Sequence, residues 1–335
     1  MSPNRTPTGR TPTGRTQTDP TQTDRTQTDR TQTGVVLMLA FCLLSPLLDA
    51  FSKLATADIP VGQIAAARFL VQGALMLPLA LAMRLSLIPA RQDLPMILAR
   101  ALVLLMSTYC FVAGVKVMPI ADALAIVFVM PFILMLMGKV IFGNPVGPRR
   151  IAASLVGFGG ALLVIQPSLS HYGPAALFPL ATAFLFALYE VMTQAMSGRV
   201  HPVTMQLHNA VAGSLIALPL IWSANGSGIV EMDPVWPLGW NWLWLAGVGF
   251  WAATSHLCMT FALKFAPAST LAPLHYLEIP MAVLLGYLIW GDFPNAMTWA
   301  GIVVITGSGL YIVRREQIIA SQARSARQAA PRLAE

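Results

Sequence analysis

The chain has 335 residues, of which 56% are hydrophobic and only 10% are charged. Soluble globular proteins carry roughly 25% charged residues, so the composition excludes that class and indicates a membrane protein. The net charge of +7 does not indicate nucleic-acid binding, because the basic residues stand singly at the ends of apolar runs and in the two tails. The three cysteines lie inside apolar runs without metal-ligand spacing, so we expect no metal site and no cofactor.

The first 34 residues form a tail of low complexity. A five-residue unit such as TQTDR repeats from residue 6 onward, and it offers no large apolar side chain that a core could bury. We therefore expect residues 1–34 to be a disordered cytoplasmic tail.

Ten mostly apolar runs follow, each close to the 20 or so residues that a helix needs to cross a bilayer core of about 30 Å. The predicted spans are 35–54, 61–83, 95–115, 121–142, 149–166, 173–195, 204–223, 241–263, 269–290 and 296–313, with a basic tail over 314–335. Several predicted spans contain an internal proline that favours a kink beside a polar cavity, namely Pro46, Pro78, Pro131, Pro219 and Pro280. The expected fold is an all-α integral membrane protein with ten transmembrane helices.

Charge in the connections predicts the orientation. Every second connection is basic, with Arg84, Arg91, Arg199 and Lys264 as examples, and the intervening ones are mostly acidic. Basic connections stay in the cytoplasm, so both termini are predicted to be cytoplasmic. This pattern is typical of a multi-pass protein of a bacterial cytoplasmic (inner) membrane.

The two halves of the chain, 35–166 and 173–313, repeat each other. Seven residues recur at one constant offset of 148: Ser107, Cys110, Lys116, Pro119, Gly138, Gly143 and Gly159 match Ser255, Cys258, Lys264, Pro267, Gly286, Gly291 and Gly307. Each repeat holds five predicted helices, an odd number, so the second copy enters the membrane from the opposite side. Inverted repeats are typical of carriers that alternate between two shapes around a central site.

Two stretches carry a family resemblance. Ala67-Arg68-Phe69-Leu70 and the run PMAVLLGYLIWG from Pro280 to Gly291, followed by Asp292, resemble the drug/metabolite transporter superfamily, in proteins built from two EamA-type five-helix domains. The first copy of that run ends in Asn144, where the family commonly has an acidic residue. The run DAFSK from Asp49 to Lys53, and Tyr276-Leu277-Glu278, resemble the S-adenosylmethionine and riboflavin uptake branches. The resemblance implies a small organic metabolite as substrate.

Ionisable side chains inside membrane helices are costly and point to function. Asp49 and Lys53 lie four residues apart on one helix face, and Arg68 lies at a similar depth in the second span. These three could form a gate at the outer side, with Arg68 binding an anionic group. A permanent structural ion pair is the alternative.

A second group of polar residues lies in the sixth and ninth predicted spans. Glu278, flanked by His275 and Tyr276, falls near the middle of the bilayer, and we expect it to meet the substrate or a coupling proton. Glu190 stands 141 residues after Asp49 and is expected to line the same pathway. Hydrogen bonding between helices is the alternative for both carboxylates. His256 is interpreted as a packing residue.

The sequence favours a secondary transporter over an enzyme. It contains no HExxH, GxSxG or phosphate-binding glycine loop. An intramembrane enzyme is the alternative function from a different class of protein. Uptake of a metabolite similar to S-adenosylmethionine or riboflavin is favoured, and export of amino acids, drugs or toxic metabolites is the alternative. The expected partners are the substrate, the lipid bilayer and coupling protons.

Overall fold

The computed structural model describes residues 20–143, 147–292 and 295–329, and every regular element in these ranges is helical. The elements are α1 (Pro20–Ala55), α2 (Val61–Ala82), η1 (Arg91–Asp93), α3 (Leu94–Val117), α4 (Ile120–Val127), α5 (Met130–Phe142), α6 (Pro148–Tyr172), η2 (Gly173–Ala176), α7 (Leu177–Met196), α8 (Pro202–Ala224), α9 (Asn241–Phe265), α10 (Ala268–Leu271), η3 (Ala272–Leu277), α11 (Glu278–Trp290) and α12 (Ala296–Ala329).

Eight stretches of the described chain are long and apolar enough to cross a membrane. They correspond to α1 from Arg30 onward, α2, η1 with α3, α4 with α5, η2 with α7, α8, α9, and α10 through α11. The helices α6 and α12 carry shorter apolar stretches, Ile151–Gly160 and Trp299–Tyr311. The protein is therefore an all-α, multi-pass membrane protein, and the count of ten spans stays a prediction.

Two helices extend further than the sequence predicts. The first begins at Pro20, so residues 20–34, which the sequence analysis places in the tail, continue the first helix, and residues 1–19 lie outside the described chain. The last runs to Ala329 instead of ending at 313. Once a helix is nucleated, each added residue gains one hydrogen bond, and polar residues such as Gln and Arg continue it at small cost. Proline is tolerated in the first helical turn.

The fourth and ninth predicted spans are interrupted. The fourth consists of α4 and α5, and Pro131 stands in the first turn of α5, where its missing N–H costs nothing. The ninth passes from α10 through the 3₁₀ helix η3 to α11. By contrast, Pro46, Pro78 and Pro219 lie inside continuous helices. The breaks lie at residues 127–130 and directly before Glu278.

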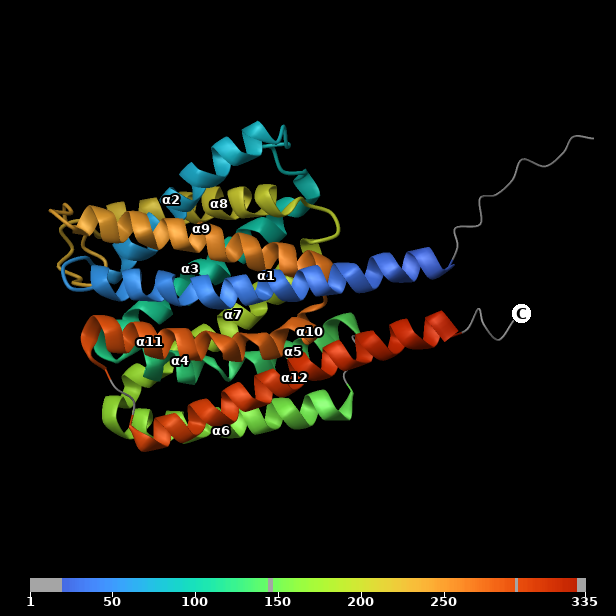
Figure 1. Cartoon of the computed structure of the whole chain (residues 1–335). Helices are drawn as coiled ribbons and strands as arrows, with labels where there is room; N and C mark the ends of the chain where they lie inside the picture. Colours follow the sequence, from blue (N-terminus) through green and yellow to red (C-terminus); the bar gives the residue numbers. More distant parts are fainter. Residues whose placement is uncertain (1–19, 144–146, 293–294, 330–335) are drawn as a thin grey trace, which may run out of the picture.

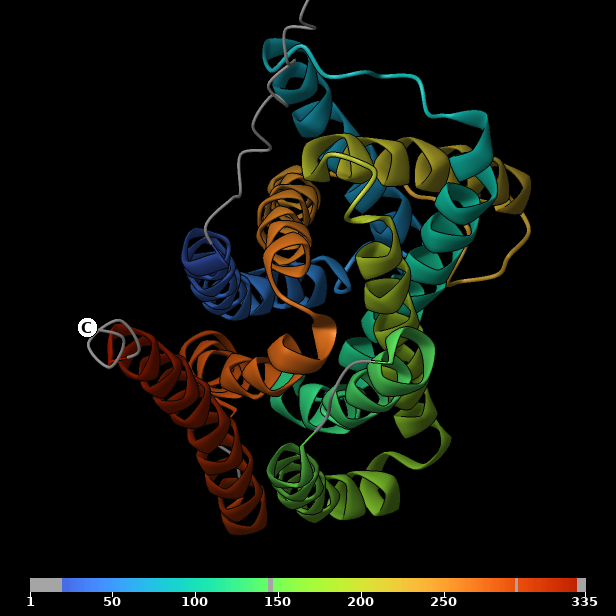
Figure 2. The same ribbon diagram turned by 90° about the vertical axis from the view of Figure 1, so that its right-hand side faces the viewer.

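The repeat is visible in the arrangement of the helices. The starts of α4, α5 and α6 at 120, 130 and 148 recur at 268, 278 and 296 as the starts of α10, α11 and α12. Equivalent helices also pack together, α2 against α8 and α6 against α12, at opposite sides of the molecule (Figures 1 and 2). Figure 1 shows α12 ending at the end of the molecule where α6 begins, which supports the predicted inversion.

Both ends of the described chain lie at one end of the helix bundle, which we call the terminal end (Figure 1). The α2–α3, α7–α8 and α9–α10 connections, which carry Arg84, Arg91, Arg199 and Lys264, lie at this end too. The α1–α2 and α8–α9 connections lie at the opposite end. This arrangement matches the alternation of basic and acidic connections.

Close packing of α2 against α9 leads to a stability prediction. A Cβ atom added at Gly249 on α9 would overlap the Cβ of Val71 on α2, which no change of rotamer can move. Overpacking of this kind costs about 1–3 kcal/mol, so Gly249→Ala is expected to lower the melting temperature of the detergent-solubilised protein. Gly159→Ala is the matched control, because a Cβ there meets no atom within 4 Å. Equal melting temperatures for the two variants would contradict the α2–α9 packing.

Candidate functional site

A cavity lies where the interrupted helices meet α1, α2, α3, α7 and α9. Its lining combines charged groups, hydroxyls and aromatic rings: Ser45, Leu48, Asp49, Ser52, Arg68, Ser107, Thr108, Phe111, Val112, Leu124, Val127, Phe128, Met130, Thr182, Phe186, His256 and Glu278. The cavity volume is about 70 Å³. Pockets for drug-sized ligands run to about 300–1,000 Å³, so this shape of the protein must widen to hold such a molecule.

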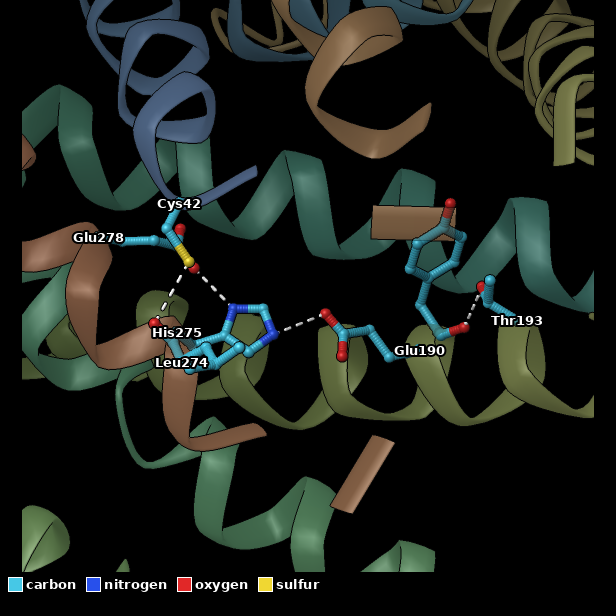
Figure 3. A network of polar contacts seen from close by, with 7 residues as sticks. Cys42, Glu190, Thr193, Leu274, His275 and Glu278 are labelled. Atoms are coloured by element: carbon cyan, nitrogen blue, oxygen red, sulfur yellow. Dashed lines mark hydrogen bonds and ion pairs between the residues drawn. The ribbon is translucent and has the colours of Figure 1, made fainter. Parts of the chain in front are cut away.

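Glu278 connects the cavity to a buried ionic network (Figure 3). Nδ1 of His275 lies 2.6 Å from Oε1 of Glu278, and Nε2 of His275 lies 2.9 Å from Oε1 of Glu190. The Nε2 contact falls outside hydrogen-bond angles, so it acts mainly through charge. A neutral imidazole has a single N–H, so its other nitrogen would turn a lone pair toward a carboxylate. The geometry therefore favours a protonated His275 between two carboxylates.

The surroundings bury this network. His275 and Glu190 are fully buried, and Glu278 stands in the first turn of α11, where the helix dipole favours a negative charge. The rings of Phe41 and Phe186 meet His275 edge to face, and Cys42 on α1 donates a hydrogen bond to the carbonyl of Leu274 over 3.2 Å (Figure 3). Among the described residues, no group of three or more His, Cys, Asp or Glu side chains is placed to hold a metal ion.

Arg68 reaches into the same cavity from α2. Its guanidinium donates a hydrogen bond to Thr108 Oγ1 on α3, and Nη2 lies 2.7 Å from Nε2 of His256 on α9. Thr108 and His256 stand at equivalent positions in the two repeats, 148 residues apart. His256 is therefore part of the cavity wall, whereas the sequence interpretation assigned it to packing.

The structure does not pair Asp49 with Lys53, which was the ion-pair alternative for these two residues. Lys53 Nζ lies 3.5 Å from Asp292 Oδ2 and 4.8 Å from the ring centroid of Trp290, so its charge is compensated by α11 and the turn after it. The long lysine side chain extends toward the opposite end of the bundle, away from Asp49. Asp49 instead lines the cavity with Arg68 and Glu278, so the three predicted outer residues separate into two places.

Tyr276 and Glu190 do not line the cavity. The ring of Tyr276 packs against Phe128 and lies where Gly157 on α6 and Gly309 on α12 leave room for it. It turns away from the cavity because η3 presents neighbouring side chains in different directions. Glu190 lies behind the cavity and reaches it through His275 and Glu278. Of the predicted pathway residues, Arg68 and Glu278 face the cavity directly.

Arg100 on α3 is a polar residue that the sequence analysis missed. It is fully buried and donates hydrogen bonds to Thr193 Oγ1 (2.9 Å), the Met205 carbonyl (3.2 Å) and the Tyr189 hydroxyl (2.9 Å). Its guanidinium also lies 4.7 Å from the ring centroid of Tyr189. The sequence does contain a feature that identifies it: an arginine more than one turn inside a predicted span needs a polar partner for its buried charge.

Ion pairs join the two repeats at both ends of the bundle. At the opposite end, Lys53 pairs with Asp292, and Lys116 pairs with Glu231 over 2.7 Å. At the terminal end, Arg199 lies 3.5 Å from Asp93. Each pair has at least one half-exposed or exposed partner, so we expect the pairs to be individually weak and to open without a large energetic cost.

Known proteins with similar sequences are transporters. The chain is 30% identical over 219 residues to a riboflavin transporter of Rhizobium johnstonii, covering 65% of this chain and 70% of that protein. It is 27% identical over 287 residues to the pseudopaline exporter CntI of Pseudomonas aeruginosa, covering 85% and 97%. An S-adenosylmethionine uptake transporter of Rickettsia prowazekii is 22% identical over 224 residues, covering 65% and 71%.

Structure and family comparisons agree on the fold. A crystal structure that is 21% identical superposes with a TM-score of 0.68, covering 85% of this chain and 98% of that one. The model of the EamA-like transporter family matches twice, over residues 32–166 and 173–314, which coincide with the two repeats. The chain therefore belongs to the EamA-like transporter family.

Proposed function

We propose that the protein is a secondary transporter that moves a small organic metabolite by alternating access, with riboflavin-like uptake as its activity. The observation that carries the proposal is the cavity, which is lined by residues of both repeats, together with the ion pairs that join the repeats at both ends of the bundle. Rocking of one repeat against the other would open each end in turn. The terminal end, which carries the basic connections, is the cytoplasmic side of the inner membrane in this proposal.

The cavity lining favours a planar substrate with a polar edge. Phe111, Phe128 and Phe186 provide rings on which a flat heteroaromatic group can stack. Hydroxyl groups of the serine and threonine residues in the lining suit a hydroxylated tail. Riboflavin has both features, and the similarity to a riboflavin transporter supports it as the first compound to test.

Glu278 is the proposed link between transport and a proton gradient. It faces the cavity and contacts His275, so a proton could pass between the cavity and the buried network as the cavity opens. Asp49 and Arg68 are proposed to contact the cargo. The names of the family and of the similar proteins point to transport and not to catalysis.

Export is the second candidate function. The similarity to the pseudopaline exporter covers 85% of this chain, whereas the riboflavin transporter and the S-adenosylmethionine uptake transporter each cover 65% of it. Two architecturally equivalent repeats work in either direction, so the gradients and the coupling ion determine the direction of transport.

Growth and transport by cells separate these functions. We expect expression of the protein to let a riboflavin-requiring bacterial strain without its own uptake system grow on low riboflavin, with saturable accumulation of labelled compound. Net loss of label from preloaded cells, without accumulation from outside, would support export. Failure of riboflavin and S-adenosylmethionine to move in either direction would overturn the proposed substrate class.

A further inference from the structure

Three positions that correspond between the two repeats carry different kinds of side chain in each repeat. The helices α1 and α7 end at Ala55 and Met196, and α2 and α8 begin at Val61 and Pro202, so both pairs share an offset of 141. This register places Asp49 opposite Glu190. The starts of α5 and α11 share an offset of 148, which places Val127 and Met130 opposite His275 and Glu278.

In the second repeat these positions form an internally compensated group. His275 lies within 3 Å of an oxygen of both Glu190 and Glu278. In the first repeat, the two apolar residues replace the imidazole and the second carboxylate, and both line the cavity beside Asp49. The three first-repeat positions thus line the cavity, whereas their counterparts in the second repeat contact one another through His275.

Asp49 has no hydrogen-bond or ion-pair partner in the described chain. It is 6% exposed, lines the cavity, and makes neither a hydrogen bond nor an ion pair with another described residue. Lys53, one turn further along α1, pairs with Asp292. Arg68, the cation in the same cavity, is engaged by Thr108 and His256. A buried carboxylate without a hydrogen-bond donor is costly, and a ligand that supplies the donor removes that cost.

We propose that Asp49 is the carboxylate that binds the cargo by accepting an N–H group, while Arg68 donates to an adjacent oxygen of the same molecule. The two residues together would recognise a cargo molecule that carries an N–H donor next to an acceptor oxygen. The imide edge of a flavin presents an N–H between two carbonyl oxygens, and an amino acid headgroup presents an ammonium beside a carboxylate. This assignment deepens the proposed transport function and rests on it.

The first variant to test is Asp49→Asn, in purified protein reconstituted into liposomes. Loss of a charge-assisted hydrogen bond is expected to raise the KM for the transported compound about ten- to a hundredfold, with a smaller change in maximal rate. Asp49→Glu is expected to recover part of the affinity. Asp58→Asn is the matched control, because Asp58 lies in the α1–α2 connection and accepts a hydrogen bond from Asn241.

A second variant rebuilds the missing partners. Val127→His combined with Met130→Glu places an imidazole and a carboxylate beside Asp49, as in the second repeat, and is expected to abolish binding while the protein stays folded. Adding Asp49→Asn to this pair leaves binding abolished. Binding is measured as the rise in melting temperature of the detergent-solubilised protein with riboflavin or S-adenosylmethionine, and the compound that binds identifies the headgroup.

The outcomes are distinguishable. A wild-type protein that moves either compound, with Asp49→Asn at the wild-type KM, would overturn the assignment of Asp49 and leave the proposed function standing. A folded V127H/M130E variant that binds cargo as the wild type does would also overturn it. A wild-type protein that neither binds nor moves either compound would overturn the proposed function together with this cargo assignment.

Discussion

Replacing Glu278 by glutamine is expected to reduce uptake to background, by about a hundredfold or more, because side chains that transfer protons contribute effects of this size. Glutamine keeps the shape of the residue and can still contact His275, but it cannot exchange a proton. Glu278 lines the cavity and lies 2.6 Å from His275, so it is the member of the network that the cavity reaches directly. The measurement is initial uptake rate per folded protein in liposomes, with and without an imposed pH gradient.

The matched control for this experiment is Asp233→Asn. Asp233 lies in the α8–α9 connection, outside the cavity, and accepts a hydrogen bond from the backbone N–H of Gly226. We expect this variant to retain uptake, whereas Glu278→Asp retains part of it because the charge remains. Full activity in E278Q would remove Glu278 from the mechanism.

Replacing His275 by glutamine is expected to cost about 3–5 kcal/mol of folding stability, because it leaves Glu190 and Glu278 buried without their shared cation. Both Glu190 oxygens lack a hydrogen-bond donor with good geometry among the described residues, so the charge of His275 is their main compensation. The measurement is the free energy of unfolding in mixed micelles titrated with denaturing detergent.

Adding Glu190→Gln to the His275→Gln variant tests the cause of that loss. The double variant has one buried carboxylate fewer, so we expect it to regain a large part of the stability but none of the uptake. A double variant that is less stable than H275Q, by roughly the sum of the single effects, would show that the two residues act independently.

The sequence predicts the helices and the repeat well because membrane spans depend on length and apolar content, which are local properties. The same is true of the interruption beside Pro131, where proline chemistry fixes the start of α5. The extended first helix is different. Composition alone predicts disorder for residues 20–34, but composition does not include the stabilising effect of the adjoining membrane helix.

The polar site was predicted in part. Ionisable residues in apolar spans identified Arg68, Glu190, His275 and Glu278 because a buried charge needs a partner wherever it lies. The choice of partner depends on helices distant in sequence. The four-residue spacing makes Asp49 the nearest candidate for Lys53, but the structure pairs Lys53 with Asp292. Tyr276 was placed in the pathway by proximity to Glu278, but its direction depends on the 3₁₀ geometry of η3.

Riboflavin counterflow in proteoliposomes tests alternating access most directly. Vesicles are loaded with unlabelled riboflavin and diluted into a trace of labelled riboflavin, without any ion gradient. The account predicts a transient accumulation of label that is saturable and abolished in empty vesicles, with net uptake increased by an inward proton gradient. Label that equilibrates at the same rate in loaded and empty vesicles, or no entry of label under any gradient, would contradict it.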